Sequence, residues 1–320
     1  MTAGTSPPAF EALDRDTYRR LVRPRNGPAL AHLALRAGFH LALLALSARL
    51  AAGGSVVAAL AVLVPHWAAW SFLGWAGLGH ELFHRNVLTS RRANGFLFRA
   101  CSILTLSNDA FFELTHPLHH RHTLGAADIE ANADARIPAR QVIWLVTLDI
   151  PGLFRRLRLL SLNAAGRIPG DARIQALAPY GSPEWRAVRD GARRVLAVQA
   201  GLAAVFLAAG QPILLAGVTL APFMLSCFNR ALALLQHAGL EAGAPETRFE
   251  ASTRTVRLGP VGAFFYANMN LHLAHHVWPA IPFYNLPEAD RALARAGGWP
   301  HETHGFLAGL RLLARLNTAP

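Results

Sequence analysis

Histidines are the residues of this 320-residue chain whose types and spacing most clearly indicate chemistry. Nine of its 15 histidines fall into four short segments. In chain order these are His80-Glu-Leu-Phe-His84, His116-Pro-Leu-His119-His120, His237 and His272-Leu-Ala-His275-His276. Neutral imidazole is the commonest protein ligand for transition metals, and nine imidazoles exceed what one tetrahedral or octahedral ion can bind. The sequence therefore predicts two metal ions side by side, which indicates redox chemistry rather than a structural clip.

Helical spacing explains how these segments could serve two ions. The first pair is four residues apart and shares one helix face. His116 and His119 are three residues apart and share a face as well, whereas His120 is turned by about 100°. The segment that begins at His272 repeats this arrangement. One helical turn can then offer two ligands to one metal and a third to its neighbour.

The same histidines are also compatible with two other classes of protein. His80-Glu81-x-x-His84 is the zinc-protease signature, with two zinc ligands and a general-base glutamate. That interpretation leaves seven histidines without a role, and Val87 and Ser90 stand where the extended signature has glycine and histidine. A metal transporter is the third class, but transport sites normally lie near the midplane of spanning helices. We expect the histidines here to lie outside the spans.

Composition indicates an integral membrane protein. Hydrophobic residues make up 52% of the chain and charged residues only 16%, against the ~25% charged residues of typical globular domains. No charged residue occurs between Arg49 and Glu81, or between Arg194 and Arg230. Each of these runs exceeds the ~20 apolar residues that a helix needs to cross a bilayer.

The net charge of +12 comes entirely from arginine, because the chain contains no lysine. The arginines cluster at the ends of the apolar runs, which favours a membrane surface as partner and argues against nucleic acid. Arginine in place of lysine, together with abundant alanine, is typical of a GC-rich bacterial genome, so we expect a bacterial inner membrane. Cys101 and Cys227 show no pairing pattern, and no disulfide is expected.

The chain divides into three predicted parts: an N-terminal arm over residues 1–28, a membrane domain over 29–290 and an amphipathic tail over 291–320. The arm is rich in proline and arginine and has no signal-peptide core. Its arginines place it in the cytoplasm by the positive-inside rule.

We predict an all-α membrane domain with about four spanning helices in two hairpins. The first hairpin turns at Gly53-Gly54, and its first span carries Arg36 and Arg49 near the two ends, where long side chains can snorkel. The second hairpin comes from the run 195–229, broken at Gly210-Gln211-Pro212.

The apolar patches between residues 93 and 190 are too short to span. They predict helices on the cytoplasmic face, which form a helical cap. All nine histidines then emerge on that side, at the cap.

The segment from Asn268 to Pro287 (Asn-Met-Asn-Leu-His-Leu-Ala-His-His-Val-Trp-Pro-Ala-Ile-Pro-Phe-Tyr-Asn-Leu-Pro) closely resembles the third histidine box of the membrane fatty acid desaturase/hydroxylase superfamily. The segment His116–Thr123 resembles the second box, and Gln236-His237-Ala-Gly resembles the extra ligand before the third. The resemblance covers roughly residues 35–290. One departure is Asp128-Ile129-Glu130, where the family often has Asp-Pro-Glu.

The resemblance implies a site of two non-heme irons, with dioxygen as co-substrate. It implies a fatty acyl or other long-chain apolar substrate taken from membrane lipids, and a separate electron donor of the ferredoxin, rubredoxin or cytochrome b5 type. We expect desaturation of a fatty acyl chain. A hydroxylase, or an oxidative decarboxylase acting on a lipid, fatty acid or alkane, would use the same ligands and stays open.

The remaining polar candidates have supporting roles. Glu81, His122, Asp128 and Asn268 could hold ring nitrogens of the ligands in the required tautomer. Within the predicted spans, His32, His40 and His66 are expected to pack through hydrogen bonds. His301 and His304 follow the last box in a polar stretch and are expected to face solvent.

Overall fold

The computed structural model describes residues 9–131, 137–241, 249–297 and 301–318 as a mostly helical chain with two short strands. Three helical stretches are long and apolar enough to cross a bilayer. They are Asn26–Ala52, Val56–Phe83 and Pro183–Ala208. The helical prediction is confirmed, whereas the described residues contain one membrane-length helix fewer than the four spans expected.

The first two stretches form a hairpin. α2 (Asn26–Ala52) packs along α3 (Val56–Trp70). The turn between them contains Gly54, whose φ of 80° is a conformation that glycine adopts without a steric penalty. The second stretch continues through η2 (Ser71–Leu73) into α4 (Leu78–Phe83). Gly77 makes this change of direction possible, because a Cβ there would lie 2.1 Å from the carbonyl oxygen of Phe72.

α10 (Pro183–Ala208) begins well before the predicted start of the third span. The Ser182 side chain accepts a hydrogen bond from the Trp185 amide, and Pro183 occupies the first turn, so the helix is capped there. The chain reverses at Gly210, whose φ is 66°. It returns in pieces rather than as one helix, because a proline lies in its middle piece. The pieces are η3 (Leu215–Thr219), η4 (Ala221–Phe223) and α11 (Cys227–Leu235).

The helices between the two apolar regions are too short to span a bilayer core of ~30 Å. They are α5 (Arg91–Leu104), α6 (Asp109–His122), α7 (Ala139–Leu145), α8 (Ile150–Ala164) and α9 (Ala172–Leu177). Asp109, at the start of α6, accepts hydrogen bonds from Arg99 of α5 at 3.2 Å and Arg194 of α10 at 2.8 Å. This buried carboxylate fixes the position of α6, which carries three of the candidate ligands.

The ends of the chain pack together on the remaining side of the molecule. The N-terminal elements are η1 (Ala9–Ala12) and α1 (Arg15–Leu21). The C-terminal elements are α12 (Phe249–Ser252), β1 (Thr255–Arg257), α13 (Pro260–Phe265), α14 (His272–Val277), α15 (Leu286–Gly297), β2 (Glu302–His304) and α16 (Phe306–Thr318). β1 and β2 pair in parallel, with Thr255 opposite Glu302. Arg20 of α1 forms an ion pair with Glu288 of α15 at 2.5 Å.

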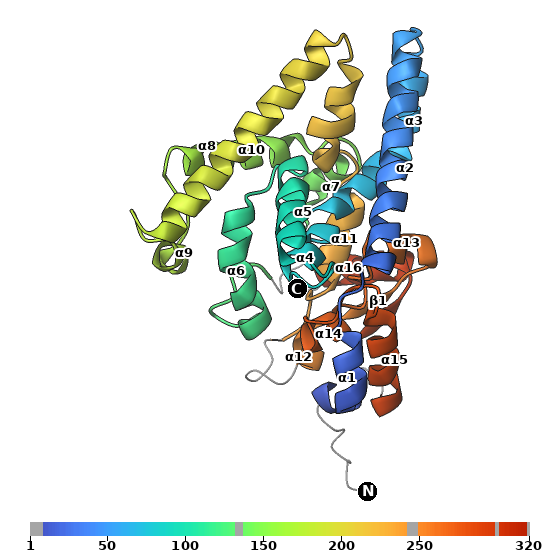
Figure 1. Ribbon diagram of the computed structural model, residues 1–320, viewed down its shortest axis with the longest axis vertical. Helices are drawn as coiled ribbons and strands as arrows, with labels where there is room; N and C mark the ends of the chain where they lie inside the picture. The colour runs from blue at the N-terminus through green and yellow to red at the C-terminus, as the bar shows by residue number, and fades with distance from the viewer. Residues whose placement is uncertain (1–8, 132–136, 242–248, 298–300, 319–320) are drawn as a thin grey trace, which may run out of the picture.

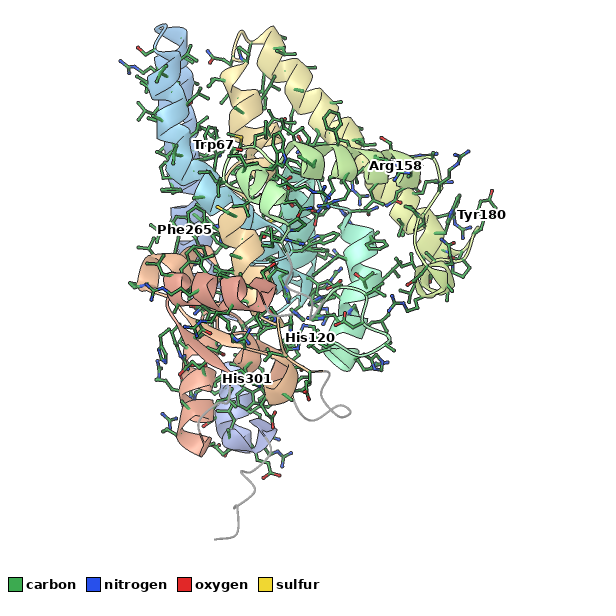
Figure 2. All side chains as sticks on the ribbon, turned by 180° about the vertical axis from the view of Figure 1, so that it is seen from behind. Trp67, His120, Arg158, Tyr180, Phe265 and His301 are labelled. Atoms are coloured by element: carbon green, nitrogen blue, oxygen red, sulfur yellow. The ribbon has the colours of Figure 1, made fainter. Side chains whose placement is uncertain are left out.

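The long apolar helices extend beyond the histidine-bearing elements at one end of the molecule. α2, α3 and the end of α10 project at one end, whereas α14, α15 and α1 lie at the other (Figure 1). Figure 2 shows Trp67 of α3 toward the first end and His120 of α6 nearer the second. The largest buried apolar cluster joins α3, α4, α5 and the segment around α14, so the core lies directly beside the histidines.

Candidate metal centre

Four separate segments bring the nine predicted histidines together. α4 carries His80 and ends at His84, and α6 carries the second set. His237 lies just after α11, and α14 carries the last three. Their ring nitrogens form two groups, within each of which the candidate atoms lie at most 4.8 Å apart. One group is His80, His84, His116, His120 and His275, and the other is His119, His237, His272 and His276.

The division between the groups differs from the pairing expected from the sequence. His116 shares its group with His120, four residues on, and His119 belongs to the other group. On α14 the pair is likewise His272 and His276. A separation of four residues rotates a side chain by only about 40° more than one full turn, whereas three residues fall about 60° short. Each triplet nevertheless places two of its rings in one group and the third in the other.

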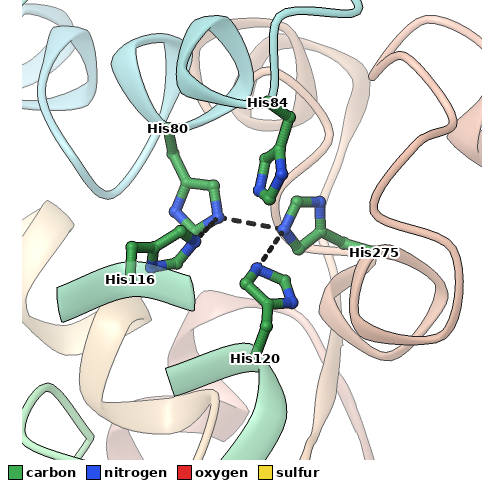
Figure 3. A group of neighbouring side chains, drawn as sticks. All are labelled: His80, His84, His116, His120 and His275. Atoms are coloured by element: carbon green, nitrogen blue, oxygen red, sulfur yellow. Dashed lines mark hydrogen bonds between the residues drawn. The ribbon is translucent and has the colours of Figure 1, made fainter. Parts of the chain in front are cut away.

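Figure 3 shows the group of five, in which rings from α4, α6 and α14 point toward one centre. The Nε2 atom of His80 lies 2.9 Å from Nε2 of both His116 and His275. The Nε2 atoms of His275 and His120 are 3.2 Å apart. His84 completes the group from the end of α4.

The group of four is built in the same way and lies next to the first. The Nε2 atom of His272 lies 3.0 Å from that of His237 and 3.1 Å from that of His276. His276 also stacks on His120 of the group of five, with ring centroids 4.5 Å apart. The two centres are therefore neighbours.

Oxygen atoms lie close to the Nδ1 nitrogens of many of these rings, on the side away from the group centres. Nδ1 of His80 lies 2.9 Å from the Trp75 carbonyl, and Nδ1 of His237 lies 2.7 Å from that of Ser252. In three other rings, the Nδ1 atom lies close to a carboxylate oxygen instead of a carbonyl oxygen. The pairs are His116 with Glu130 at 2.8 Å, His119 with Asp128 at 3.0 Å and His275 with Glu81 at 3.1 Å.

These contacts determine whether the Nε2 nitrogens, which face one another, carry a hydrogen or a lone pair. A carbonyl only accepts hydrogen bonds, so His80 and His237 must carry their hydrogens on Nδ1. Their Nε2 atoms are then bare lone pairs. The Nε2 atom of His80 faces that of His116 at 2.9 Å, and the Nδ1 atom of His116 lies against the Glu130 carboxylate, so its Nε2 atom is a lone pair as well when Glu130 is ionised. Two lone pairs repel at this distance unless a cation lies between the rings. The arrangement fits two metal ions, held by five and four imidazoles, with carbonyls and carboxylates that fix the tautomers.

The protonation states agree with this arrangement. Burial lowers the pKa of His116, His272 and His276 well below the ordinary value, and the neighbouring imidazoles lower it further. Burial also lowers the pKa of His237 to about 3. These rings are neutral near pH 7, which is the form that binds metals.

The pKa values of the carboxyl groups of Glu130 and Asp128 shift in opposite directions. Burial raises the pKa of Glu130 to about 7, although the His119 imidazole and the Thr115 hydroxyl oppose the shift. Burial also disfavours the charged form of Asp128, but hydrogen bonds from His119 and from the amides of Glu130 and Leu124 outweigh it and lower its pKa to about 2. Asp128 is therefore charged near pH 7.

Of the four supporting candidates, Glu81 and Asp128 lie behind ligand rings. Glu81 is fully buried, and neither its carboxylate nor His275 Nδ1 makes a hydrogen bond within the described part of the chain. Asn268 instead donates to the Phe283 carbonyl at 2.9 Å, and His122 belongs to neither histidine group. Glu130 was not among the candidates, although the acidic motif Asp128-Ile129-Glu130 contained the signal.

Several expectations about the other residues are modified. The structure places His80 inside a membrane-length helical stretch, Val56–Phe83, rather than beyond its end. Arg36 does not snorkel, because it is only 2% exposed. His40 and His66 do pair, with their Nδ1 atoms 3.2 Å apart, and His32 packs against two phenylalanine rings. His304 is exposed, whereas His301 is half-buried.

A cavity of about 490 Å³ opens onto both groups. His80 and His116 of the first group and His119, His237 and His272 of the second line it. The remaining wall includes the apolar side chains Trp75, Phe111, Phe112, Ala233 and Leu234. Thr115, Glu130, Arg230 and Gln236 also line the cavity, so an apolar wall faces a wall of polar groups. Concave sites that combine apolar surface with convergent polar groups typically bind small molecules.

The family model for fatty acid desaturases matches residues 53–304, which include all nine histidines. No curated protein matches the sequence. Because the match covers more than half of the chain, the protein belongs to the fatty acid desaturase family.

Proposed function

We propose that this protein is a membrane oxidoreductase that uses two non-heme irons and dioxygen to desaturate a fatty acyl chain. The observation that carries the proposal is the convergence of nine imidazoles on two adjacent centres beside one apolar cavity. The nine proposed iron ligands are His80, His84, His116, His119, His120, His237, His272, His275 and His276. Two irons, when bound, would supply the oxygen activation needed to break an unactivated C–H bond.

The chain's own residues would bind and orient the substrate. Trp75, Phe111 and Phe112 offer an apolar wall, against which an acyl chain can lie while His80 and His116 face it across the cavity. Desolvation by this wall keeps water from the reacting carbon, and positioning decides which hydrogen is closest to the irons. Asp128 and Glu130 would hold the rings of His119 and His116 through hydrogen bonds at Nδ1, and Glu81 lies beside Nδ1 of His275.

Hydroxylation and oxidative decarboxylation remain alternatives, because they need the same ligands. The zinc-protease alternative is disfavoured by Glu81. Its carboxylate lies beside Nδ1 of His275 and is fully buried, whereas a general base must reach a metal-bound water on the Nε2 side. A transporter is disfavoured because nine tightly grouped imidazoles would hold an ion firmly rather than release it.

We infer a bacterial inner-membrane location with the histidine boxes on the cytoplasmic side. The three long helices and the arginine-rich flanks support this arrangement. A separate ferredoxin, rubredoxin or cytochrome b5 type protein would deliver electrons. We also propose that the segment 212–235 crosses the membrane a fourth time as short helical pieces, since α10 and α11 must be joined across it.

Mass spectrometry of lipids and hydrocarbons from cells that express the protein tests this proposal. Cells fed perdeuterated palmitate should accumulate a product lighter by two deuterium atoms, and cells expressing His116→Ala should not. A product that gains one oxygen would establish hydroxylation, and a terminal alkene shorter by one carbon would establish decarboxylation. Activity with one zinc and no iron would overturn the di-iron proposal.

A further inference from the structure

A second cavity lies among the membrane-level helices and shares no lining residue with the first. Its volume is about 620 Å³. One wall is a stripe along α2 from Leu33 to Ala48, which is about 22 Å of helix axis. Leu202 and Phe206 of α10 contribute to the opposite wall. The cavity is thus long and almost entirely apolar.

Two polar side chains, Arg36 and His40, interrupt this apolar lining. They are four residues apart on α2, so they lie on the same face of the helix. Both are buried, with 2% and 5% of their surfaces exposed. Arg36 lies ten residues into α2, about 15 Å along its axis from Asn26. An ionisable residue at such a depth in a membrane helix normally marks a functional site.

Arg36 is incompletely paired. One of its terminal nitrogens donates to the Phe265 carbonyl at 2.5 Å, and its guanidinium lies 5.7 Å from the centre of that residue's ring. Its Nε and Nη1 atoms are buried without a hydrogen-bond partner. Among the described residues, no carboxylate forms an ion pair with it. A buried cation in this state lacks the counter-charge that would offset its desolvation.

His40, next to this cation on α2, has a ring nitrogen that can accept a hydrogen bond. The Gly217 carbonyl lies 2.7 Å from Nε2 of His66, so His66 carries its hydrogen there and offers Nδ1 as a lone pair. His40 therefore donates from Nδ1 to His66, and its own Nε2 is a lone pair without a partner. Neighbouring atoms cover these groups, so a ligand in the cavity would reach the N–H donors of Arg36 and the acceptor of His40 only once the two side chains turn toward it.

We propose that this cavity is a second lipid site, which binds a single-chain fatty acid by its carboxyl group. The carboxylate would neutralise Arg36, and its tail would follow the apolar stripe of α2 toward Ala48. His40 can accept a hydrogen bond from this group only when the carboxyl is protonated, so binding of the ionised acid depends on Arg36. Charge complementarity and the long apolar wall together select a fatty acid.

Photo-crosslinking of the full-length protein in nanodiscs tests this site separately from the proposed active site. The probe is palmitic acid with a diazirine in its tail, and the matched control is the corresponding alcohol. The acid should label residues 41–48 of α2 and 202–206 of α10. Arg36→Gln should lower this labelling at least about tenfold, because a charge-assisted hydrogen bond is lost from a buried site. Labelling at Phe111 and Phe112 reports on the other cavity and should not change.

Arg49→Gln is the matched control, since Arg49 lies on the same helix but is exposed. It should leave labelling unchanged. Equal labelling of the wild type and Arg36→Gln, or equal labelling by the acid and the alcohol, would overturn the proposal. Stronger Arg36-dependent labelling by a diazirine-tailed phosphatidylglycerol would assign the site to a phospholipid instead. If Arg36→Gln does not fold, Ala48→Phe should block labelling at the far end of the cavity while it leaves Arg36 in place.

Discussion

Glu130 lies with one carboxylate oxygen 2.8 Å from Nδ1 of His116, while its other oxygen accepts from the Thr115 hydroxyl. The carboxyl group is thus held by two consecutive residues of α6. It lies behind a ring whose opposite nitrogen belongs to the group of five. This contact couples the segment after α6 to the orientation of a proposed ligand.

We expect Glu130→Gln to lower iron content or turnover by about 10–100-fold, the usual effect of losing a partner behind a metal-bound histidine. The amide can keep one hydrogen bond but cannot carry negative charge. Iron analysis and turnover should be measured on the same preparation. Glu113→Gln is the control, because Glu113 lies on the same helix and pairs with Arg85 near the surface. Equal activity of both variants would show that Glu130 has no such role.

The unequal groups predict unequal sensitivity to ligand loss. His237→Ala leaves three imidazoles in its group, whereas His84→Ala leaves four. We expect His237→Ala to lose about one iron per chain and to lower turnover by more than the ~100-fold that loss of an outer partner can cause. His84→Ala should keep more of its iron. Elemental analysis distinguishes the two variants.

His122→Ala provides the control for this prediction, since His122 follows α6's ligands but belongs to neither group. It should retain both irons. If His237→Ala kept its iron and its turnover, His237 would not be a ligand.

Topology predicts which surface positions a membrane-impermeant thiol reagent can reach. In a Cys101→Ala, Cys227→Ala background, cysteines at Arg91, Arg155 and Arg295 should be protected in intact cells if, as we propose, the histidine-bearing end faces the cytoplasm. They should react once the membrane is permeabilised. Cysteines at Ser55 and Ala209, at the far ends of the long helices, should react from outside.

Labelling of Arg91→Cys but not of Arg295→Cys in intact cells would contradict this topology. The first position lies near the α4 box and the second near the α14 box, and rings from both boxes meet in one group. The two positions must therefore respond alike.

The size of the cavity beside the histidines predicts substrate selectivity. Ala233 lines this cavity, so Ala233→Phe should shorten the accepted acyl chain or lower turnover several-fold, because overpacking a filled site is costly. Iron content should stay at the wild-type level, since Ala233 is not one of the nine proposed ligands. Product profiling by mass spectrometry measures the shift. Ala204→Phe, at an exposed position of α10, should leave the profile unchanged.

The histidine positions were predictable because ligands need a fixed chemical type at helical spacing. Which ring joins which group was not, because three- and four-residue separations both place side chains on roughly one face. The position of His80 at the end of a bent stretch depends on Gly77, and local sequence does not show how closely a neighbouring carbonyl approaches. Glu130 was missed for a related reason, since it reaches His116 only after the chain turns back at Asp128.

The membrane-spanning helices could also be predicted only in part from the sequence. Apolar runs predicted the first hairpin closely, because length and hydropathy define it. The start of α10 was missed because its first half contains four arginines and two acidic residues, so hydropathy placed the boundary too late, whereas the Ser182-Pro183 cap sets it. The depth of Arg36 was also missed, since burial depends on contacts from α13, which lies far along the chain.

The group of five joins His120 to His275, which is 155 residues further along the chain. At a synthesis rate of about 5–20 residues per second, His120 waits about 8–30 s for this partner to be made. During that interval neither group is complete, so a metal could bind with full coordination only after α14 has been synthesised and docked. Loading of the proposed irons would therefore be a late event in the biogenesis of this protein.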